Sequence, residues 1–200
     1  MRVVCVILAA GRGERLGGAK ALLKWPTAAD ERAPLALVHA RARMGVDCES
    51  VLIVTRESMA AILRRHRVNA HCHLVVSNAP DDHGPAGSLA AALPTLDGLR
   101  PGLAEADAVL VSPVDCLPAS PALVGALIDA LKCGGPNALA VRPRCAGRGG
   151  HPVLLRPGAL EAYRHVSPPP LRDVLRSLGS QLVELSTEDE RVRYDVDTPQ

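Results

Sequence analysis

The feature that most constrains this chain is an apolar run over residues 2–8 that leads directly into a glycine-rich loop over residues 9–20. A β-branched run this short, stopped by small residues, predicts a buried strand. Glycine lets the backbone of the following loop approach a ligand closely. The loop also carries two positive charges, Arg15 and Lys20. Uncovered backbone N–H groups beside fixed positive charges suit a polyphosphate, so this stretch predicts a phosphate site.

Two phosphate loops of known type do not fit this stretch. Gly13 and Gly18 have the glycine spacing of the P-loop, but Ala19 stands where that loop requires lysine. In the dinucleotide fingerprint, two residues separate the second and third glycines, whereas three residues lie between Gly13 and Gly17. The sequence also lacks the acidic residue that closes the second strand of that fold. A nicotinamide dehydrogenase is therefore disfavoured.

Further short apolar runs alternate with helical patterns along the chain. Strands are predicted over residues 51–54, 73–76, 109–111, 138–141, 153–155, 181–185 and 192–196. A helix is predicted from Pro34, with Leu35, Val38 and Ala42 on its inward face. Such alternation predicts a three-layer α/β/α Rossmann-like fold with a mostly parallel sheet, which binds ligands at the carboxyl ends of its strands. The length, 200 residues, predicts a single domain over residues 1–200.

Composition argues against several classes of partner. A net charge of +2, from 23 basic and 21 acidic residues, and only three aromatic residues do not favour nucleic acid binding. No apolar stretch reaches the roughly 18 residues of a membrane span, and the first run is too short for a signal peptide. Six cysteines without a C-x-x-C pair favour reduced thiols and a cytoplasmic location.

The first loop resembles the signature Leu-Ala-Ala-Gly-x-Ser-x-Arg-Met-Gly-x-Pro-Lys of the molybdenum cofactor nucleotidyltransferases. Seven positions match it: Leu8, Ala9, Ala10, Gly11, Arg15, Gly17 and Lys20. Glycine, leucine and alanine replace its serine, methionine and proline. The resemblance implies a nucleotidyltransferase fold in which Arg15 and Lys20 are catalytic. It also implies a nucleotide-binding segment made of Leu8, Ala9, Ala10, Gly11, Arg12 and Gly13.

Two aspartates match the family's metal ligands. Asp115 follows an apolar strand and precedes a proline closely, as the catalytic Mg²⁺ ligand of the resembling family does, although an aspartate here can also cap a turn. Mg²⁺ takes one or two carboxylates together with phosphate oxygens. Residues 194–199, Tyr-Asp-Val-Asp-Thr-Pro, are similar to the family's closing motif. Strand alternation places Asp195 and Asp197 on one face, and we expect Asp197, next to Thr-Pro, to be the second ligand.

The choice of base is expected to depend on residues 84–89, Gly-Pro-Ala-Gly-Ser-Leu. This stretch resembles the Gly-x-x-x-Ser-Leu element of relatives that use CTP, which implies that Gly84 and Ser88 bind the nucleotide. Related guanylyltransferases instead carry Leu-Ala-Gly-Gly in the first loop, so Ala10 and Ser88 both favour CTP. In the alternative, Gly84 makes a turn and Ser88 only caps a helix.

The acceptor is expected to bind at residues 149–154, Gly-Gly-His-Pro-Val-Leu, which resemble an element of the molybdopterin cytidylyltransferases. The resemblance implies that Gly150 and His151 contact the acceptor, with His151 holding a phosphate, although a lone histidine is more often structural. Arg142, Arg144 and Arg148 are candidates to steer an anionic acceptor, with ordinary solvated loop charges as the alternative.

The resemblance implies a Mg²⁺-dependent enzyme that transfers a nucleotidyl group from CTP to a phosphate-bearing acceptor, molybdopterin, and releases pyrophosphate. The expected partners are an NTP and a small phosphorylated acceptor, with neither nucleic acid nor membrane, and a protein that receives the product is considered too. The alternatives are a guanylyltransferase, an enzyme that acts on a sugar or alcohol phosphate, and a nucleotide- or cofactor-binding module without turnover.

Overall fold

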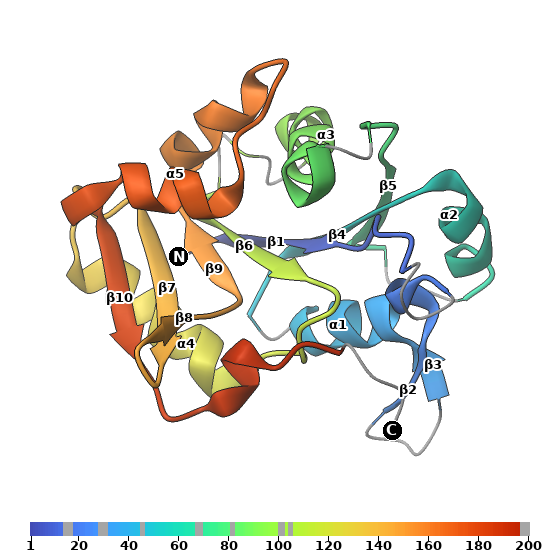
Figure 1. Cartoon of the computed structure of the whole chain (residues 1–200), viewed down its shortest axis with the longest axis horizontal. Coiled ribbons are helices and arrows are strands. Elements are labelled where there is room, and N and C mark those ends of the chain that lie inside the picture. Colours follow the sequence, from blue (N-terminus) through green and yellow to red (C-terminus); the bar gives the residue numbers. More distant parts are fainter. Residues whose placement is uncertain are drawn as a thin grey trace.

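The computed structural model describes residues 1–13, 18–27, 32–44, 47–66, 70–80, 83–99, 103 and 106–196. Its central sheet has the strand order β10-β7-β9-β6-β1-β4-β5, and β8 pairs with β7 off this path (Figure 1). The bounds are β1 Val3–Leu8, β4 Ser50–Thr55, β5 Cys72–Val76, β6 Ala108–Pro113, β7 Ala140–Cys145, β8 Arg148–Gly149, β9 Val153–Leu155 and β10 Leu182–Ser186.

The sheet is mostly parallel, as the sequence predicts. β1 pairs in parallel with β4 and β6, β4 with β5, and β10 with β7. β9 is antiparallel to both of its neighbours, β6 and β7, and β8 is antiparallel to β7. All residues of β1 and β4 are buried, which accounts for their continuous apolar sequence.

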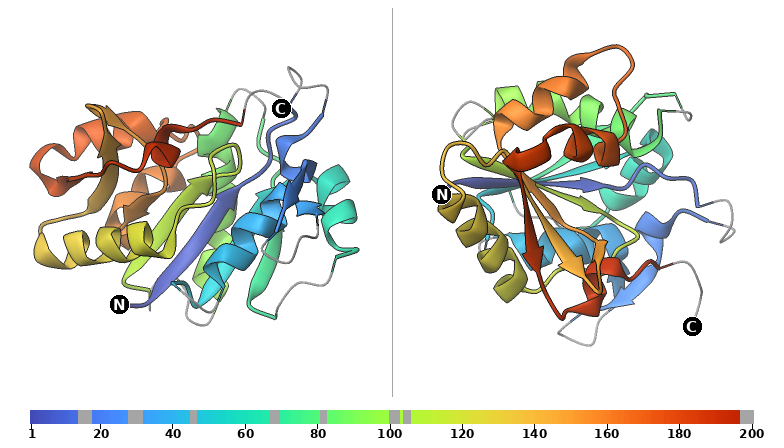
Figure 2. Two further views of the ribbon diagram at one scale, coloured as in Figure 1. Left: turned by 90° about the horizontal axis from the view of Figure 1, so that it is seen from below. Right: turned by 60° about the vertical axis from the view of Figure 1, so that its left-hand side comes forward.

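Helices cover both faces of the sheet and make the three predicted layers (Figure 2). The helices are α1 Leu35–Arg43, α2 Glu57–Leu63, α3 Gly84–Gly98, α4 Pro121–Cys133 and α5 Leu171–Ser177. Short 3₁₀ segments are η2 Lys20–Leu22, η4 Pro157–Arg164, η5 Gly179–Gln181 and η6 Glu190–Arg193. The helices α1, α2 and α4 pack in one apolar cluster, while α3, η4 and α5 pack in the other. Successive side chains of β1 alternate between the two clusters.

The expected inward face of α1 is only partly right. Leu35 is buried, but Val38 and Ala42 are half-exposed, whereas His39 and Arg43 are buried. The reason is that α1 is covered on more than one side. It contacts β1 and β4, and it also packs against a small antiparallel ladder of β2 (Lys24–Pro26) and β3 (Arg32–Pro34).

The expected strand over residues 192–196 is wrong. Residues 190–193 form η6, and the chain then makes an isolated antiparallel bridge between Asp195 and Cys116. The Asp189 carboxylate accepts a hydrogen bond from the Arg191 backbone N–H at 3.1 Å and starts this 3₁₀ turn. Such a local bond competes with strand pairing. Within the described ranges, no helix is long and apolar enough to cross a membrane.

Candidate functional site

The candidate site lies where β1 and β6 end. The two strands are parallel neighbours with Leu8 opposite Pro113, so the loops that follow them leave the sheet side by side. The Val114 backbone N–H donates to the Leu8 carbonyl oxygen at 3.0 Å and extends this pairing by one step. Asp115 is therefore placed beside the start of the glycine-rich loop, as expected from the carboxyl ends of parallel strands.

The start of the glycine-rich loop is fixed to β4. The Ala9 N–H donates to the Val54 carbonyl at 2.8 Å, and the Thr55 hydroxyl donates to the Ala9 carbonyl at 3.2 Å. Ala9 and Ala10 are buried, whereas Gly11 and Arg12 are exposed. The loop thus passes from the core to the surface within two residues.

Further along, the loop closes on itself. The Gly18 N–H donates to the Gly13 carbonyl at 3.2 Å, and Gly13 has a φ of +64°. A Cβ atom at residue 13 would lie 1.9 Å from the Gly18 carbonyl oxygen, so only glycine fits there. The replacement of the signature's serine by Gly13 therefore suits the closed loop. Arg15 lies outside the described residues, and its catalytic role stays a prediction.

Lys20 joins the two loops electrostatically. Its Nζ atom lies 3.1 Å from Asp195 Oδ1 and 3.5 Å from Asp115 Oδ2. The side chain of Lys20 is 17% exposed, while those of Asp115 and Asp195 are 38% and 51% exposed. The structure thus brings together Lys20 and Asp115, which the sequence selects, with Asp195. Asp197 lies outside the described residues, so the preference for it over Asp195 stays a prediction.

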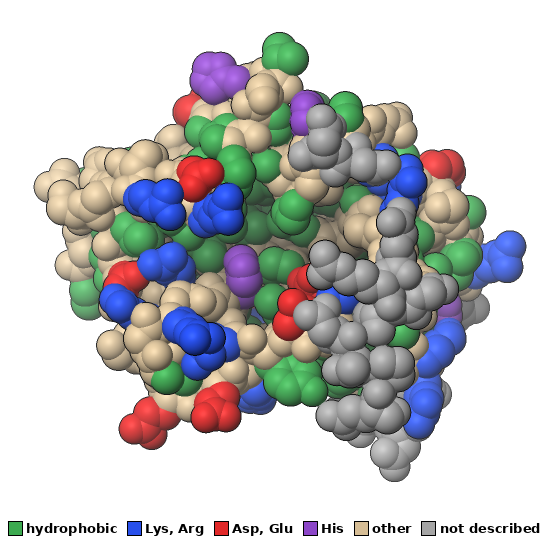
Figure 3. Space-filling view, viewed as in Figure 1, with side chains coloured by type: hydrophobic (Ala, Val, Ile, Leu, Met, Phe, Trp, Pro, Cys, Tyr) green, Lys and Arg blue, Asp and Glu red, His purple; other side chains and the backbone are tan. Residues whose placement is uncertain are grey.

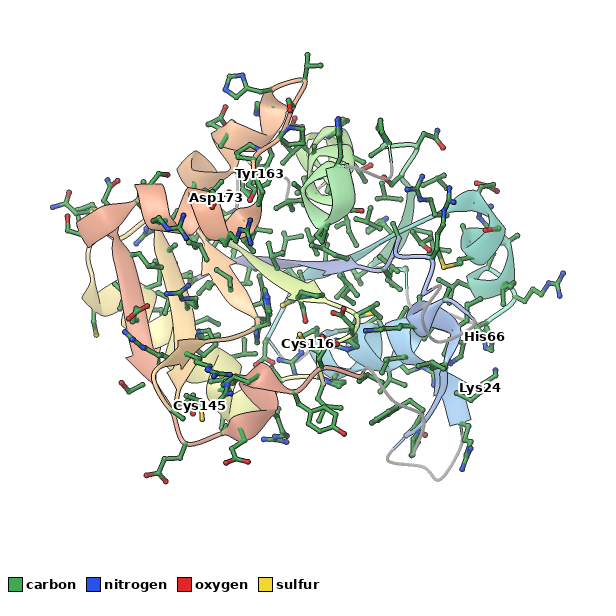
Figure 4. The ribbon with its side chains drawn as sticks, in the orientation of Figure 1. Lys24, His66, Cys116, Cys145, Tyr163 and Asp173 are labelled. Carbon is green, nitrogen blue, oxygen red and sulfur yellow. The ribbon has the colours of Figure 1, made fainter. Side chains whose placement is uncertain are left out.

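Asp195 reaches this place because the tail pairs with the loop after β6. Besides the bridge between Asp195 and Cys116, the Val196 N–H donates to the Asp115 carbonyl at 2.6 Å. Figure 4 labels Cys116 between the end of β6, helix α1 and this tail. The two carboxylates are therefore held by a directly hydrogen-bonded pair of backbone segments.

The two carboxylates fit a hard divalent cation such as Mg²⁺. Both are partly exposed, and both contact the same ammonium nitrogen, which shows that one positive charge can be shared between them. Among the described residues, no group of three or more His, Cys, Asp or Glu side chains forms a metal-holding cluster. Mg²⁺ needs no such cluster, because it keeps several waters and takes phosphate oxygens of the substrate.

The Gly84 and Ser88 pair begins α3 at the same edge of the sheet, after β5. Gly84 has a φ of +50°. Ser88 is buried, and its hydroxyl donates to the Gly84 carbonyl one turn earlier, at 3.5 Å. Ser88 does not cap the helix, since the N-cap position is His83. The alternative interpretation of Ser88 as a helix cap is therefore wrong.

Gly150 and His151 pack against η6, and His151 is hydrogen-bonded to it. The His151 N–H donates to the Val192 carbonyl at 2.8 Å, and a Cβ at residue 150 would lie 2.2 Å from that carbonyl oxygen. Burial lowers the pKa of His151; the Asp115 carboxylate opposes this shift, and the Arg142 guanidinium adds to it. His151 therefore lies within electrostatic reach of both groups. Its Nδ1 atom is buried, with no hydrogen-bond partner in the described part of the chain.

Two of the three arginines considered for the acceptor lie in one strand and form ion pairs. Arg142 and Arg144 belong to β7, not to the loop expected there, and both pair with the Glu184 carboxylate on β10. These hydrogen bonds lower the pKa of Glu184. Arg148 is exposed in β8. Figure 3 shows a hollow in this face walled by a histidine, with basic groups on one side and acidic groups on the other.

Two residues at the site belong to none of the sequence motifs, and the sequence therefore does not select them. His39 and Arg43 lie on α1 and are buried, at 3% and 5% exposure. His39 Nε2 bonds the Cys116 carbonyl at 2.8 Å, and an Arg43 N–H donates to the Ala119 carbonyl. Burial lowers the pKa of His39 to about 4. The only indication in the sequence is their spacing of four, which places both on one helix face.

Comparison with solved structures supports the fold. Rv0371c from Mycobacterium tuberculosis is 21% identical with a TM-score of 0.74, covering 94% of this chain and 88% of its own. A second structure of it, with manganese, has a TM-score of 0.68 at the same identity and coverage. The 4-diphosphocytidyl-2C-methyl-D-erythritol synthase from Anaerococcus prevotii is 13% identical with a TM-score of 0.67, covering 98% and 91%.

A nucleotidyl transferase from Methanothermobacter thermautotrophicus is 19% identical with a TM-score of 0.63, covering 98% of this chain and 92% of its own. No curated protein matches the sequence. A family model described as the MobA-like NTP transferase domain matches residues 5–184. That match includes the glycine-rich loop, Lys20, Asp115 and His151. The chain belongs to the MobA-like NTP transferase family.

Proposed function

We propose that the protein is a Mg²⁺-dependent nucleotidyltransferase that transfers CMP from CTP to the phosphate of molybdopterin and releases pyrophosphate. The observation that carries this proposal is the contact of Lys20 with both Asp115 and Asp195 beside the glycine-rich loop. In a member of this family, a basic group and two carboxylates beside that loop support the binding of a nucleoside triphosphate together with a divalent cation.

Each described group of the site has a task in such a transfer. Asp115, with Asp195 or Asp197, would hold Mg²⁺, which supplies charge neutralisation at the phosphate oxygens. The exposed part of the loop from Gly11 offers backbone N–H groups to the triphosphate. Lys20, released from the carboxylates when the cation binds, would turn to the phosphates with Arg15.

The reaction is an in-line displacement. An oxygen of the acceptor phosphate forms a bond to the α-phosphorus, while the bond from that phosphorus to the oxygen bridging to the β-phosphorus breaks. Pyrophosphate leaves with that bridging oxygen, and no covalent intermediate with the protein is formed. The side chains act by orientation and by neutralising charge, which is how proteins catalyse phosphoryl chemistry of this kind.

The acceptor would bind on the His151 side of the hollow. The lowered pKa makes His151 a neutral imidazole at physiological pH. Because Nδ1 is buried and has no partner among the described residues, the favoured tautomer carries its proton on Nε2: buried N–H groups without a partner are rarer in proteins than buried acceptors without one. His151 would thus present its Nε2–H to an acceptor oxygen, and the β7 arginines would attract an anionic acceptor. The Gly150 N–H is not available for this, because it donates to the Pro143 carbonyl at 2.9 Å.

Pyrophosphate release with each of the four NTPs, measured with Mg²⁺ and a panel of acceptors, tests the proposal. The panel includes molybdopterin, a sugar phosphate and a sugar-alcohol phosphate. We expect release only with CTP and molybdopterin together. Release with GTP would identify a guanylyltransferase, release with another acceptor would change the substrate, and tight NTP binding without release would indicate a binding module.

A further inference from the structure

One face of helix α1 carries two polar side chains where an apolar face would be expected. His39 is 3% exposed and Arg43, one turn later, is 5% exposed. Burial of polar groups is costly unless they are hydrogen-bonded. Their positions therefore point to a task that leucine at either place would not perform.

Both side chains bond backbone carbonyls of the loop that follows β6. His39 Nε2 lies 2.8 Å from the Cys116 carbonyl oxygen. A carbonyl oxygen only accepts, so Nε2 carries the proton and donates it. Arg43 donates to the Ala119 carbonyl near the far end of the loop, and its other terminal nitrogen pairs with Asp47 at 2.5 Å. Helix α1 thus holds the loop at two places.

The carbonyl that His39 holds is adjacent to both carboxylates of the site. Cys116 directly follows Asp115 in the chain, and its backbone forms the bridge to Asp195. The Asp115 carbonyl accepts the Val196 N–H on the same side of this pairing. A rotation of the peptide at Cys116 would therefore change the position of Asp115 and of Asp195 together.

Helix α1 also supports the third group of the site. The Leu35 N–H at its start donates to the Leu23 carbonyl at 2.8 Å, directly after the η2 turn that carries Lys20. The apolar side of α1 packs on β1 and β4, which fixes the helix to the sheet. The donor at His39 is consequently held by a helix that packs on two fully buried strands.

We infer that His39 is a positioning residue, which holds the Cys116 carbonyl and thereby sets the spacing of Asp115 and Asp195 for a divalent cation. This inference rests on the proposed metal site. Arg43 secures the other end of the loop, four residues from Asp115, and serves the stability of the loop. The two side chains therefore have separable effects, although they lie one helical turn apart.

The test measures the binding of Mn²⁺ alone, by calorimetry and by the loss of the EPR signal of free Mn²⁺. The melting temperature of every variant is measured as well. His39→Leu fills the space without a donor and should weaken Mn²⁺ binding about tenfold. His39→Gln restores an N–H at similar reach and should return affinity to within about threefold of the unaltered protein. Arg43→Lys keeps the pair with Asp47 and should lower the melting temperature but leave Mn²⁺ affinity within about twofold.

Asp115→Asn tests the metal site separately from the positioning role of His39, because it removes a proposed metal ligand. Loss of Mn²⁺ binding in Asp115→Asn with unaltered affinity in His39→Leu would overturn the positioning role and leave the metal site standing. Unaltered affinity in Asp115→Asn would overturn the metal site itself. If His39→Leu does not fold, His39→Asn replaces it with the same expectation, since its amide ends short of the Nε2 position.

Discussion

Lys20 is the residue on which the two loops of the site converge, and its contacts are electrostatic. A pair between partly exposed charges contributes little to folding, on the order of 0–1 kcal/mol. A cation that stabilises a developing negative charge has a much larger effect on rate. Lys20 should therefore matter for turnover and hardly at all for stability.

We predict that Lys20→Ala lowers turnover on the order of 10²–10³-fold with little change in melting temperature. Its affinity for Mn²⁺ should not fall, because the lost ammonium lies against the carboxylates that would hold the metal. Lys24→Ala, at an exposed lysine in β2, is the matched control and should behave as the unaltered protein. A Lys20→Ala protein that melts early yet turns over normally while folded would show that Lys20 is structural.

A second prediction at the residue scale concerns pH. Burial lowers the pKa of His39 from 6.5 to about 4. The unfolded chain therefore binds a proton at this imidazole below about pH 6.5, which the folded protein does not bind until about pH 4. His39 alone therefore lowers the free energy of unfolding by about 2 kcal/mol as the pH falls from 7 to 5.

Urea unfolding at the two pH values measures this contribution. His39→Gln, which does not titrate, should reduce the difference between pH 7 and pH 5 by about 2 kcal/mol. The part that remains includes His151, whose pKa burial also lowers. His165→Gln, at an exposed histidine, should retain the whole difference. An equal pH dependence in the unaltered protein and in His39→Gln would show that His39 is not held neutral by burial.

At the scale of elements, the sequence predicts those strands whose formation depends mainly on their own residues. The strands over residues 51–54, 109–111 and 153–155 are found, because β-branched runs bounded by turn residues have few alternatives. The tail could not be predicted this way. Its placement depends on the bond from Asp189 to the Arg191 N–H and on pairing with Cys116, about 80 residues earlier in the chain.

The same distinction applies to the site. Lys20 and Asp115 follow from motifs next to predicted strands, and the structure places them together. His39 could not be identified from the sequence, because its function depends on a carbonyl that only the packed fold brings to α1. The burial of α1 on a second side by β2 and β3 is likewise a tertiary effect that helix periodicity does not show.

We predict that Gly150→Ala weakens Mn²⁺ binding, because residue 150 contacts η6 and η6 leads to Asp195. A Cβ at residue 150 would lie 2.2 Å from the Val192 carbonyl oxygen, so η6 must shift, and Asp195 follows three residues later. Mn²⁺ affinity should fall several-fold. Gly158→Ala is the control, since nothing lies within 4 Å of a Cβ there. Equal Mn²⁺ affinity of the two variants would mean that Asp195 is positioned independently of η6.

At the scale of the whole molecule, the proposed nucleotide and acceptor sites lie on two sides of one edge of the sheet. The loops after β1, β5 and β6 are suited to the nucleotide, and the β7 to β9 region with His151 is suited to the acceptor (Figure 1). The two carboxylates proposed to hold the metal lie between them, on the loop after β6 and on the tail. This layout matches the transfer of a group from one ligand to the other.

Base choice is a prediction at this scale, since it depends on the first loop and the start of α3 together. Buried polar groups of a pocket reject a ligand that leaves them unpaired. We predict a kcat/KM for CTP at least about tenfold above that for GTP, equivalent to roughly 1.4 kcal/mol in the transition state. Equal values with a working acceptor would contradict the cytidylyl assignment and leave nucleotidyl transfer intact.

The central claim is that this edge of the sheet transfers a nucleotidyl group and depends on Asp115. The most direct measurement supplies CTP labelled with ³²P at either the α or the γ position, together with molybdopterin and Mg²⁺. We predict that the α label enters the acceptor, that the γ label leaves as pyrophosphate, and that Asp115→Asn abolishes both. Transfer of the γ label to the acceptor, or undiminished transfer of the α label by Asp115→Asn, would contradict the account.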